Sequence, residues 1–272
     1  MPAKARKSPY KLSATALSCL LESPKAFYWR YIAKLEPISQ SIATYDHDKL
    51  AGSLWAAWID AFYRGVPEKE NTERLLADWH EQTEGWVPEK IKERLTKALT
   101  AWASIYHQQF SPDDGVRNGS EKLVENERFV GYVDGLSADE TTLHEVKSTS
   151  RAKSVSEQLW KVQNSIQVKL YLVLTGAKRV LIEFAYKDEP YDIWRAPVME
   201  VTKEQRKTWE QELNALADSI YALGDDPNNY PCHPDGCCLI TKNYVSLCPF
   251  QALCSQVLGA EIAFKAREYR AR

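Results

Sequence analysis

The sequence has no long hydrophobic run and almost no net charge. No stretch of about 18 consecutive apolar residues occurs, which argues against a membrane-spanning helix. The N-terminus lacks the apolar stretch of a secretory signal peptide, so we expect an intracellular, cytoplasmic protein. The formal net charge is −2, so no overall positive field attracts nucleic acid to the chain. Internal repeats and low-complexity linkers are also missing.

The composition supplies ample material for a hydrophobic core. Of the 272 residues, 44% are hydrophobic, and nine are Trp and fourteen Tyr. This composition excludes a disordered chain and a small disulfide scaffold. We expect one domain over residues 1–272, with a helical N-terminal region at 1–112, a core at 113–225 and a cysteine-rich tail at 226–272.

Apolar periodicity predicts helices first and then strands that alternate with helices. The predicted helices lie at 14–22, restarted at Pro24, and at 49–63, 70–82, 88–110, 153–175, 203–223 and from about 252. The predicted strands lie at about 121–137, 141–148, 179–187 and 191–201. This order predicts an α/β fold with a central mixed sheet flanked by helices.

The stretch from Phe129 to Lys147 combines two β-prone runs with three charged side chains. Asp134 lies near the end of the first run, and Glu145 and Lys147 lie two residues apart on the second. Side chains two apart on a strand point to the same face. The turn-forming SADET segment between the runs predicts a hairpin, which brings Asp134 back towards Glu145. A surface hairpin whose charges face solvent is the alternative interpretation.

Two carboxylates beside an ammonium suit a divalent metal next to a phosphate. A hard cation such as Mg²⁺ or Mn²⁺ prefers oxygen ligands, which Asp134, Glu145 and the carbonyl of Val146 supply. A metal-bound water is more acidic and attacks phosphorus more readily. Lys147 then orients that water or offsets the negative charge that develops on the phosphate.

Gln167 and Tyr171 lie on the helix that follows the second run. Their spacing of four residues places them on one helix face. A glutamine there is suited to bind the scissile-strand phosphate or a base edge, and the tyrosine is suited to brace it. An amphipathic helix with a polar edge is the alternative interpretation.

Together these features resemble the PD-(D/E)XK nuclease superfamily, in particular its RecB-like exonuclease branch. The opening segment LSATALSCLLESPKAFYWRYIAKL is similar to the first helix pair of that branch. The residues that fit its pattern are Ser13, Thr15, Pro24, Phe27 and Tyr31. The segments GYVDG and HEVKST resemble its two metal-ligand strands, and QVKLY resembles its Q-x-x-x-Y motif.

The resemblance implies metal-dependent cleavage of DNA by an exonuclease in recombination, repair or phage DNA processing. It also implies a helicase or recombination protein as a partner. One family feature is missing, because Ala56 stands where this branch often has a metal-binding His, and His47 precedes the predicted helix. A DNA-binding member with weak or no activity is therefore the first alternative, and a zinc-stabilised structural subunit is the second.

The tail concentrates five of the six cysteines. They are Cys232, Cys237, Cys238, Cys248 and Cys254. Such density in an intracellular chain indicates a metal. Some RecB-like nucleases carry a [4Fe–4S] cluster, and the resemblance implies Cys238 (or its neighbour Cys237), Cys248 and Cys254 as ligands. Ser23 replaces the usual N-terminal cysteine, so Cys19 is the substitute. Zinc held by Cys232, His233 and the later cysteines, or thiols without metal, are the alternatives.

The aromatic and histidine residues of the predicted helices have simpler interpretations. Five tryptophans fall in helical patterns and are expected in the core rather than as base-stacking platforms: Trp55, Trp58, Trp79, Trp86 and Trp102. His80 and His107 lack a partner motif, and His144 points to the strand face opposite Glu145. We interpret these three histidines as structural.

Overall fold

The computed structural model describes residues 10–37, 46–113, 122–151 and 154–231, and the backbone of three short strands beyond them. The chain forms two compact units. The first unit consists of residues 1–42, 127–130 and 211–272, and the second of residues 43–126 and 131–210.

The first unit begins with two short helices that serine side chains cap. The Ser13 hydroxyl accepts the N–H of Ala16 at 3.2 Å and starts α1 (Ala14–Glu22). Ser23 caps α2 (Pro24–Phe27) in the same way, and a π-helical turn follows at Tyr28–Ile32. The predicted interruption at Pro24 is confirmed, because proline is favoured in the first helical turn but not in a helix interior.

Short strand pairs and the end of a long helix complete the first unit. Strand β1 (Leu35–Pro37) pairs with β11 (Phe264–Ala266), and β9 (Leu239–Thr241) with β10 (Val245–Leu247), both antiparallel. The helix predicted from residue 252 therefore does not extend through 264–266. Helix α8 (Lys203–Leu223) begins in the second unit and ends in the first.

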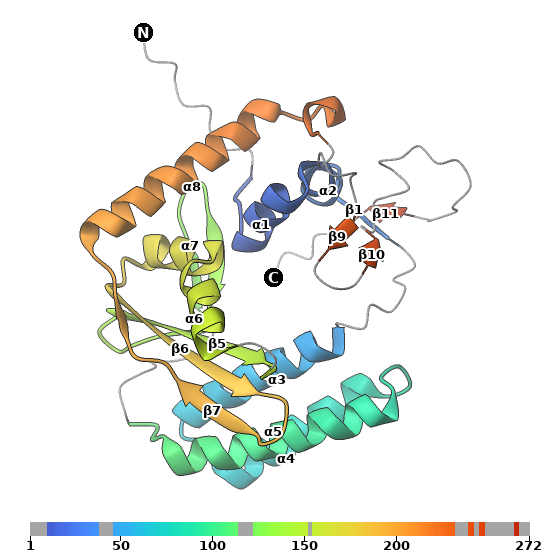
Figure 1. Cartoon of the computed structure of the whole chain (residues 1–272), viewed down its shortest axis with the longest axis vertical. Coiled ribbons are helices and arrows are strands. Elements are labelled where there is room, and N and C mark those ends of the chain that lie inside the picture. The colour runs from blue at the N-terminus through green and yellow to red at the C-terminus, as the bar shows by residue number, and fades with distance from the viewer. Residues whose placement is uncertain are drawn as a thin grey trace. The chain divides into compact units, whose positions relative to one another are not determined.

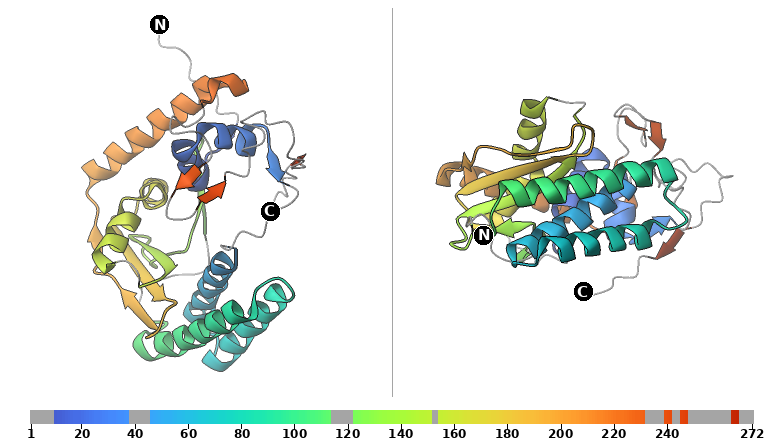
Figure 2. Two further views of the ribbon diagram at one scale, coloured as in Figure 1. Left: turned by 45° about the vertical axis from the view of Figure 1, so that its right-hand side comes forward. Right: turned by 90° about the horizontal axis from the view of Figure 1, so that it is seen from below.

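Three helices form one layer of the second unit. They are α3 (Asp46–Tyr63), α4 (Glu68–Thr83) and α5 (Glu89–Gln109), which lie side by side in the right panel of Figure 2. Their interface is rich in aromatic side chains. Trp55, Trp58, Trp79 and Trp102 are at most 2% exposed, as the sequence predicted, whereas Trp86 is half-buried.

The sheet of the second unit lies against these helices (Figure 1). Its strand order is β4–β5–β6–β7, with β8 (Met199–Glu200) also on β6. Strands β5 (Thr142–Thr149) and β6 (Arg179–Tyr186) are parallel. Strands β4 (Gly135–Leu136) and β7 (Asp192–Arg195) are antiparallel to their neighbours, so the predicted mixed sheet flanked by helices is confirmed. Strands β2 (Lys122–Glu125) and β3 (Val130–Val133) form a separate pair.

Several predicted elements are divided in the structure. The helix predicted at 153–175 is two helices, α6 (Val155–Gln163) and α7 (Ile166–Thr175). Ser165 explains the break, because its hydroxyl accepts the N–H of Val168 at 3.2 Å and starts a new helix. The run predicted at 121–137 contains β2, β3 and β4, and the run at 191–201 contains β7 and β8.

Alternation along β5 gives its two faces different surroundings. Val146 packs with Ala185 and Ile193 in the cluster formed with α3, α4 and α5. Glu145 and Lys147 point the other way, towards Gln167 of α7. The strand therefore has one face in the helical core and one face beside α7.

A buried polar network joins β5, β6 and β7 to the helical layer. The Glu183 carboxylate lies 3.0 Å from His144 Nε2, accepts the Tyr106 hydroxyl at 3.0 Å and pairs with Arg195. Tyr63 contacts both Tyr106 and Arg195. Burial acts to raise the pKa of Glu183, but His144 and Arg195 outweigh it and lower the pKa to about 2.

Glu183 is expected to contribute strongly to stability. Replacing it by Ala leaves Arg195 without its buried partner, which should lower the free energy of unfolding by about 3–5 kcal/mol. Urea unfolding measures this change. Glu93→Ala is the control, because Glu93 forms an exposed pair with Lys97 and its loss should change stability little.

The low pKa of the Glu183 carboxyl predicts that the stability of the protein depends on pH in the acid range. Because the folded-state pKa of Glu183 is about 2 and its ordinary value is 4.5, its contribution is complete above about pH 4.5 and is lost as the pH falls towards 2. The stability difference between the wild type and Glu183→Gln should therefore shrink over that range. A difference that stays constant would contradict the ion pairing.

Gly131 of β3 lies directly against the Tyr171 ring. A Cβ atom at this position would stand 2.4 Å from Tyr171 Cε1, too close for any real contact. Gly131→Ala should therefore cost about 1–3 kcal/mol of unfolding free energy, because the ring must move within a packed site. In a Tyr171→Ala background most of this cost should vanish. Equal costs in both backgrounds, by urea unfolding, would show that another contact is responsible.

Candidate metal and phosphate site

Asp134 lies at the bend between β3 and β4. The next residue, Gly135, pairs with His144 of β5 in antiparallel register. The Asp134 carboxylate accepts the backbone N–H of Val146 at 2.9 Å. The predicted hairpin is thus present, and it ties this carboxylate to the middle of β5.

Glu145 and Lys147 share one face of β5. Lys147 Nζ lies 2.8 Å from Glu145 Oε2, so their predicted orientation to one side is confirmed. Glu145 is fully buried, whereas 29% of the Lys147 side chain is exposed. The ammonium is therefore the more accessible member of the pair.

Helix α7 closes this cluster with an amide and a phenol. Gln167 Nε2 donates to Glu145 Oε2 at 3.2 Å, and Gln167 Oε1 accepts from Lys147 at 3.3 Å. Tyr171, one helical turn later, is buried and contacts Gln167. All the side chains that the sequence selected as catalytic therefore lie in one cluster of the second unit.

Burial and the charges within the cluster shift the pKa values of its side chains. Burial raises the pKa of Glu145 to about 7, with Lys147 acting against this and Asp134 reinforcing it. Burial also raises the pKa of Tyr171 to about 12, so its hydroxyl stays protonated. For Lys147, burial acts to lower the pKa, but Glu145 and Asp134 outweigh it and hold the amine protonated.

One oxygen of the cluster has no hydrogen-bond partner among the described residues. Glu145 Oε1 is buried and accepts no hydrogen bond from the described residues. A buried carboxylate oxygen without a partner is costly unless a cation compensates it. Asp134, Glu145 and the carbonyl of Val146 are hard oxygen donors, so the residues present fit a hydrated divalent cation. Among the described residues, no three His, Cys, Asp or Glu side chains form a metal-binding group.

Helix α3 approaches the cluster strand without supplying a ligand. A Cβ atom on Gly52 would lie 3.1 Å from Ser148 Oγ of β5, so the helix and the strand are close there. Ala56, one turn later, has no donor atom. His47 lies inside α3 rather than before it, with Nε2 4.0 Å from Asp48 Oδ1. The structure therefore brings no histidine of α3 into the described contacts of Glu145.

Of the residues predicted to bind a metal in the cysteine-rich site, only Cys19 is among the described residues. Cys19 lies on α1 in the first unit and is half-buried. The other predicted ligands lie outside the described residues: Cys232, His233, Cys237, Cys238, Cys248 and Cys254. The choice between an iron–sulfur cluster, zinc and no metal therefore stays open.

Sequence reasoning missed the buried network behind the site. Glu183 was not selected, although a single acidic residue within the apolar run RVLIEFAYK is a signal of a buried partner. His144, assigned a structural role, is that partner. Among the other histidines assigned as structural, His107 lies 3.9 Å from Glu68.

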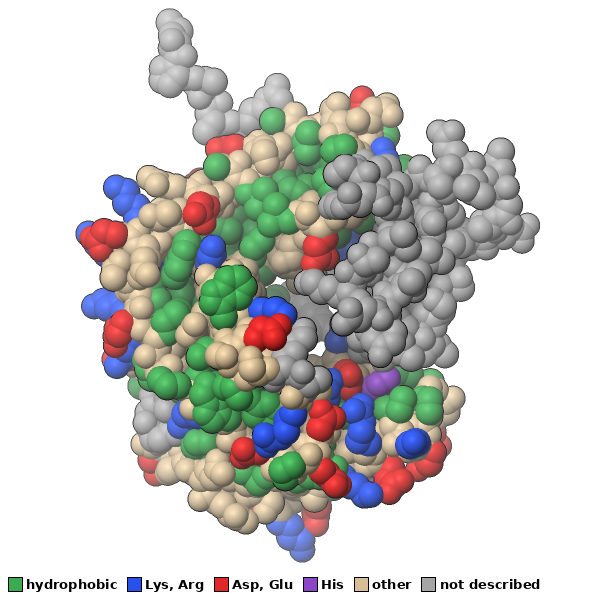
Figure 3. All heavy atoms as spheres, in the orientation of Figure 1, with side chains coloured by type: hydrophobic (Ala, Val, Ile, Leu, Met, Phe, Trp, Pro, Cys, Tyr) green, Lys and Arg blue, Asp and Glu red, His purple; other side chains and the backbone are tan. Residues whose placement is uncertain are grey.

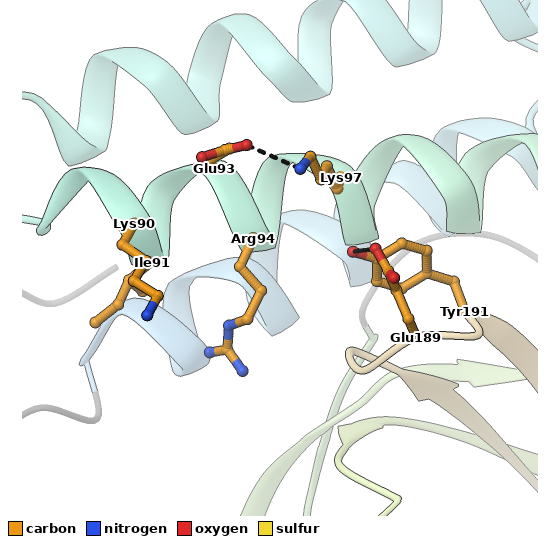
Figure 4. Close-up of a pocket in the computed structure, with 7 residues that line it drawn as sticks. All are labelled: Lys90, Ile91, Glu93, Arg94, Lys97, Glu189 and Tyr191. Carbon is orange, nitrogen blue, oxygen red and sulfur yellow. Dashed lines mark hydrogen bonds and ion pairs between the residues drawn. The ribbon is translucent and has the colours of Figure 1, made fainter.

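A shallow groove of about 370 Å³ lies elsewhere in the second unit (Figure 4). Its lining comes from α5 and the loop between β6 and β7: Lys90, Ile91, Glu93, Arg94, Lys97, Glu189 and Tyr191. None of the predicted catalytic residues lines it.

The described residues on the face shown in Figure 3 carry both positive and negative side chains. No helix in the described part of the chain is long and apolar enough to cross a membrane.

The chain has low sequence identity to three solved structures that match part of it. A "Putative exonuclease" from Eubacterium rectale has 11% identity and a TM-score of 0.46, covering 80% of this chain and 84% of its own. A phage-related exonuclease from Haemophilus somnus 129PT has 14% identity and a TM-score of 0.37, covering 79% and 95%. The protein SSO0001 has 13% identity and a TM-score of 0.27, covering 65% and 76%.

Comparison with families gives the more extensive match. No curated protein matches the sequence significantly. The model of the PD-(D/E)XK nuclease superfamily matches residues 11–255, which include the second unit, most of the first and every residue of the cluster. The chain therefore belongs to the PD-(D/E)XK nuclease superfamily.

Proposed function

We propose that the protein is a metal-dependent DNA nuclease whose centre is the cluster of Asp134, Glu145, Lys147, Gln167 and Tyr171. The observation that carries this proposal is the buried Glu145 carboxylate. One of its oxygens accepts no hydrogen bond from the described part of the chain, and the other lies beside an ammonium. This arrangement supports a site that a cation and a phosphate complete. The nuclease superfamily to which the chain belongs is consistent with that chemistry.

Each side chain has a separate role in the proposed reaction. Asp134, Glu145 and the Val146 carbonyl hold Mg²⁺ or Mn²⁺, which when bound polarises the phosphate and acidifies water. Lys147 places its ammonium where negative charge develops during hydrolysis. Gln167 hydrogen-bonds to both Glu145 and Lys147 and orients the DNA strand that is cleaved. Tyr171, as a neutral phenol, supports the Gln167 side chain.

Exonuclease action in recombination, repair or phage DNA processing is the finer part of the proposal. It rests on the resemblance of the N-terminal helices and of the Gln167–Tyr171 motif to the RecB-like branch. Cleavage assays on linear end-labelled DNA and on a covalently closed circle of the same sequence distinguish exonuclease from endonuclease activity. An exonuclease degrades the linear DNA from its ends and leaves the circle intact, whereas cleavage of the circle would show an endonuclease.

An inactive DNA-binding member is the second candidate function. Ala56 favours it, because α3 approaches β5 at Gly52 without contributing a metal ligand one turn later. The complete Asp134, Glu145 and Lys147 set favours the active enzyme. DNA binding without cleavage, in both Mg²⁺ and Mn²⁺, would decide for the inactive member.

The cysteine-bound metal remains part of the proposal. A [4Fe–4S] cluster on Cys19, Cys238, Cys248 and Cys254 would join distant segments of the chain. Zinc is the alternative cofactor. Iron and zinc analysis of anaerobically purified protein distinguishes these cases, since iron–sulfur protein is brown and zinc protein is colourless.

The carboxylates of the cluster are expected to be essential for cleavage. Glu145→Gln and Asp134→Asn preserve shape but remove a negative charge from the cation site, so the cleavage rate should fall at least about 100-fold. Asp139→Asn, in the same hairpin but at the exposed turn, is the matched control. The assay is release of labelled nucleotides in Mg²⁺, with unfolding curves to verify the fold. Normal rates in either cluster variant would refute the proposed centre.

Lys147 is expected to act on turnover more than on affinity. Its ammonium stabilises charge that develops in the transition state, so Lys147→Ala should lower kcat about 100-fold with a much smaller change in the Kd for DNA. Lys147→Arg should restore little, because a planar guanidinium does not replace a compact ammonium.

The control for this variant is Lys122→Ala, since Lys122 of β2 forms an exposed pair with Glu140 of the turn between β4 and β5. Single-turnover cleavage and equilibrium DNA binding measure the two quantities separately. If Lys147→Ala binds DNA poorly and cleaves bound DNA at the normal rate, Lys147 is a binding residue instead.

A further inference from the structure

Helix α6 presents a large aromatic side chain to solvent. Trp160 is 64% exposed, more than any other large hydrophobic side chain of the described residues. By contrast, Trp55, Trp58, Trp79 and Trp102 are at most 2% exposed. An exposed indole combines a large apolar ring with a polar N–H, which suits it to contact a ligand or a partner.

The position of α6 connects Trp160 to the candidate site. The helix follows β5, which carries Glu145 and Lys147, and precedes α7, which carries Gln167. Only Asn164 and Ser165 separate α6 from α7. Trp160 therefore lies on the segment that joins the two parts of the cluster.

Polar contacts hold α6 in place without covering Trp160. Gln158 is the buried side chain of the helix, and its Nε2 donates to the Ser150 carbonyl at 3.2 Å. Ser154 caps the first turn, and Asn164 Nδ2 donates to the Trp160 carbonyl at 2.8 Å. The backbone at Trp160 is thus fixed while its ring stays exposed.

The charge of this segment suits a polyanion. Residues 151–169 contain four basic side chains and one acidic side chain, although the whole chain has a net charge of −2. The basic residues are Arg151, Lys153, Lys161 and Lys169, and the acidic one is Glu157. Among the described ones, Lys161 follows Trp160 but pairs with Glu157, Arg151 pairs with Asp192, and Lys169 lies over the Trp209 ring. An excess of basic residues on a segment that carries an exposed aromatic ring is a feature of proteins that bind single-stranded nucleic acids.

We propose that Trp160 stacks on a nucleobase of a single DNA strand whose phosphate lies at Lys147 and Gln167. This inference rests on the proposed function and specifies its substrate. Stacking needs an exposed base face, and in a duplex both faces are covered by neighbouring base pairs. The protein therefore prefers a single-stranded or frayed end over an intact duplex.

Binding in the absence of metal tests this proposal without cleavage. The probe is a short single-stranded oligonucleotide with 2-aminopurine, a fluorescent adenine analogue whose emission falls on stacking, placed at successive positions. Wild type should quench one position. Trp160→Ala should abolish that quenching and weaken binding about 5- to 100-fold, whereas Trp160→Phe should retain most of both. Trp86→Ala, which removes a half-buried indole from the α4–α5 connection, should behave as wild type.

The strand preference separates stacking from a structural role. With Mg²⁺ or Mn²⁺, Trp160→Ala should slow cleavage of single-stranded DNA more than that of duplex DNA. An equal loss on both substrates would overturn the proposal, as would quenching and affinity that do not depend on Trp160. Quenching and affinity that do not depend on Trp160 would indicate that its exposed ring contacts another protein instead. If wild type cleaves no DNA with either metal, the proposed function fails, yet the quenching experiment still decides the role of Trp160.

Discussion

The position of Glu145 in the middle of a buried strand is the constraint on which the rest of this structure depends. Its neighbours on the strand, His144 and Val146, point into the helical layer, where Glu183 and the aromatic core hold them. Glu145 itself faces α7, and within the part of the chain that the structure describes, Lys147 and Gln167 satisfy only one of its oxygens. Strong anchoring on one face thus offsets the cost of an incompletely paired carboxylate on the other, as is common at functional sites.

Local patterns were sufficient to predict the cluster. The spacing of Glu145 and Lys147 determines a shared face whatever surrounds the strand, and the turn after Asp134 determines the hairpin. The spacing of Gln167 and Tyr171 similarly depends on a helix alone. The mixed sheet followed from the order of strands and helices, because a parallel pair such as β5 and β6 needs a helical connection.

Features that depend on tertiary contacts were not predictable in the same way. A continuous apolar pattern over 153–175 does not reveal that Ser165 caps a new helix, which begins at Ile166. Glu183 has its partners on two other strands and a helix, and the helix residue Tyr106 lies 77 residues before it. The exposure of Trp160 depends on what packs around α6, since a tryptophan in a helical pattern is usually buried.

Diffraction from crystals soaked in Mn²⁺ tests the central claim most directly, because manganese is located by its anomalous scattering. The account predicts an anomalous peak coordinated by the carboxylates of Asp134 and Glu145, with Glu145 Oε1 as a ligand, and no peak there in Glu145→Gln crystals. The account would be contradicted by wild-type crystals in which manganese binds only at other places and Glu145 contacts only Lys147 and Gln167.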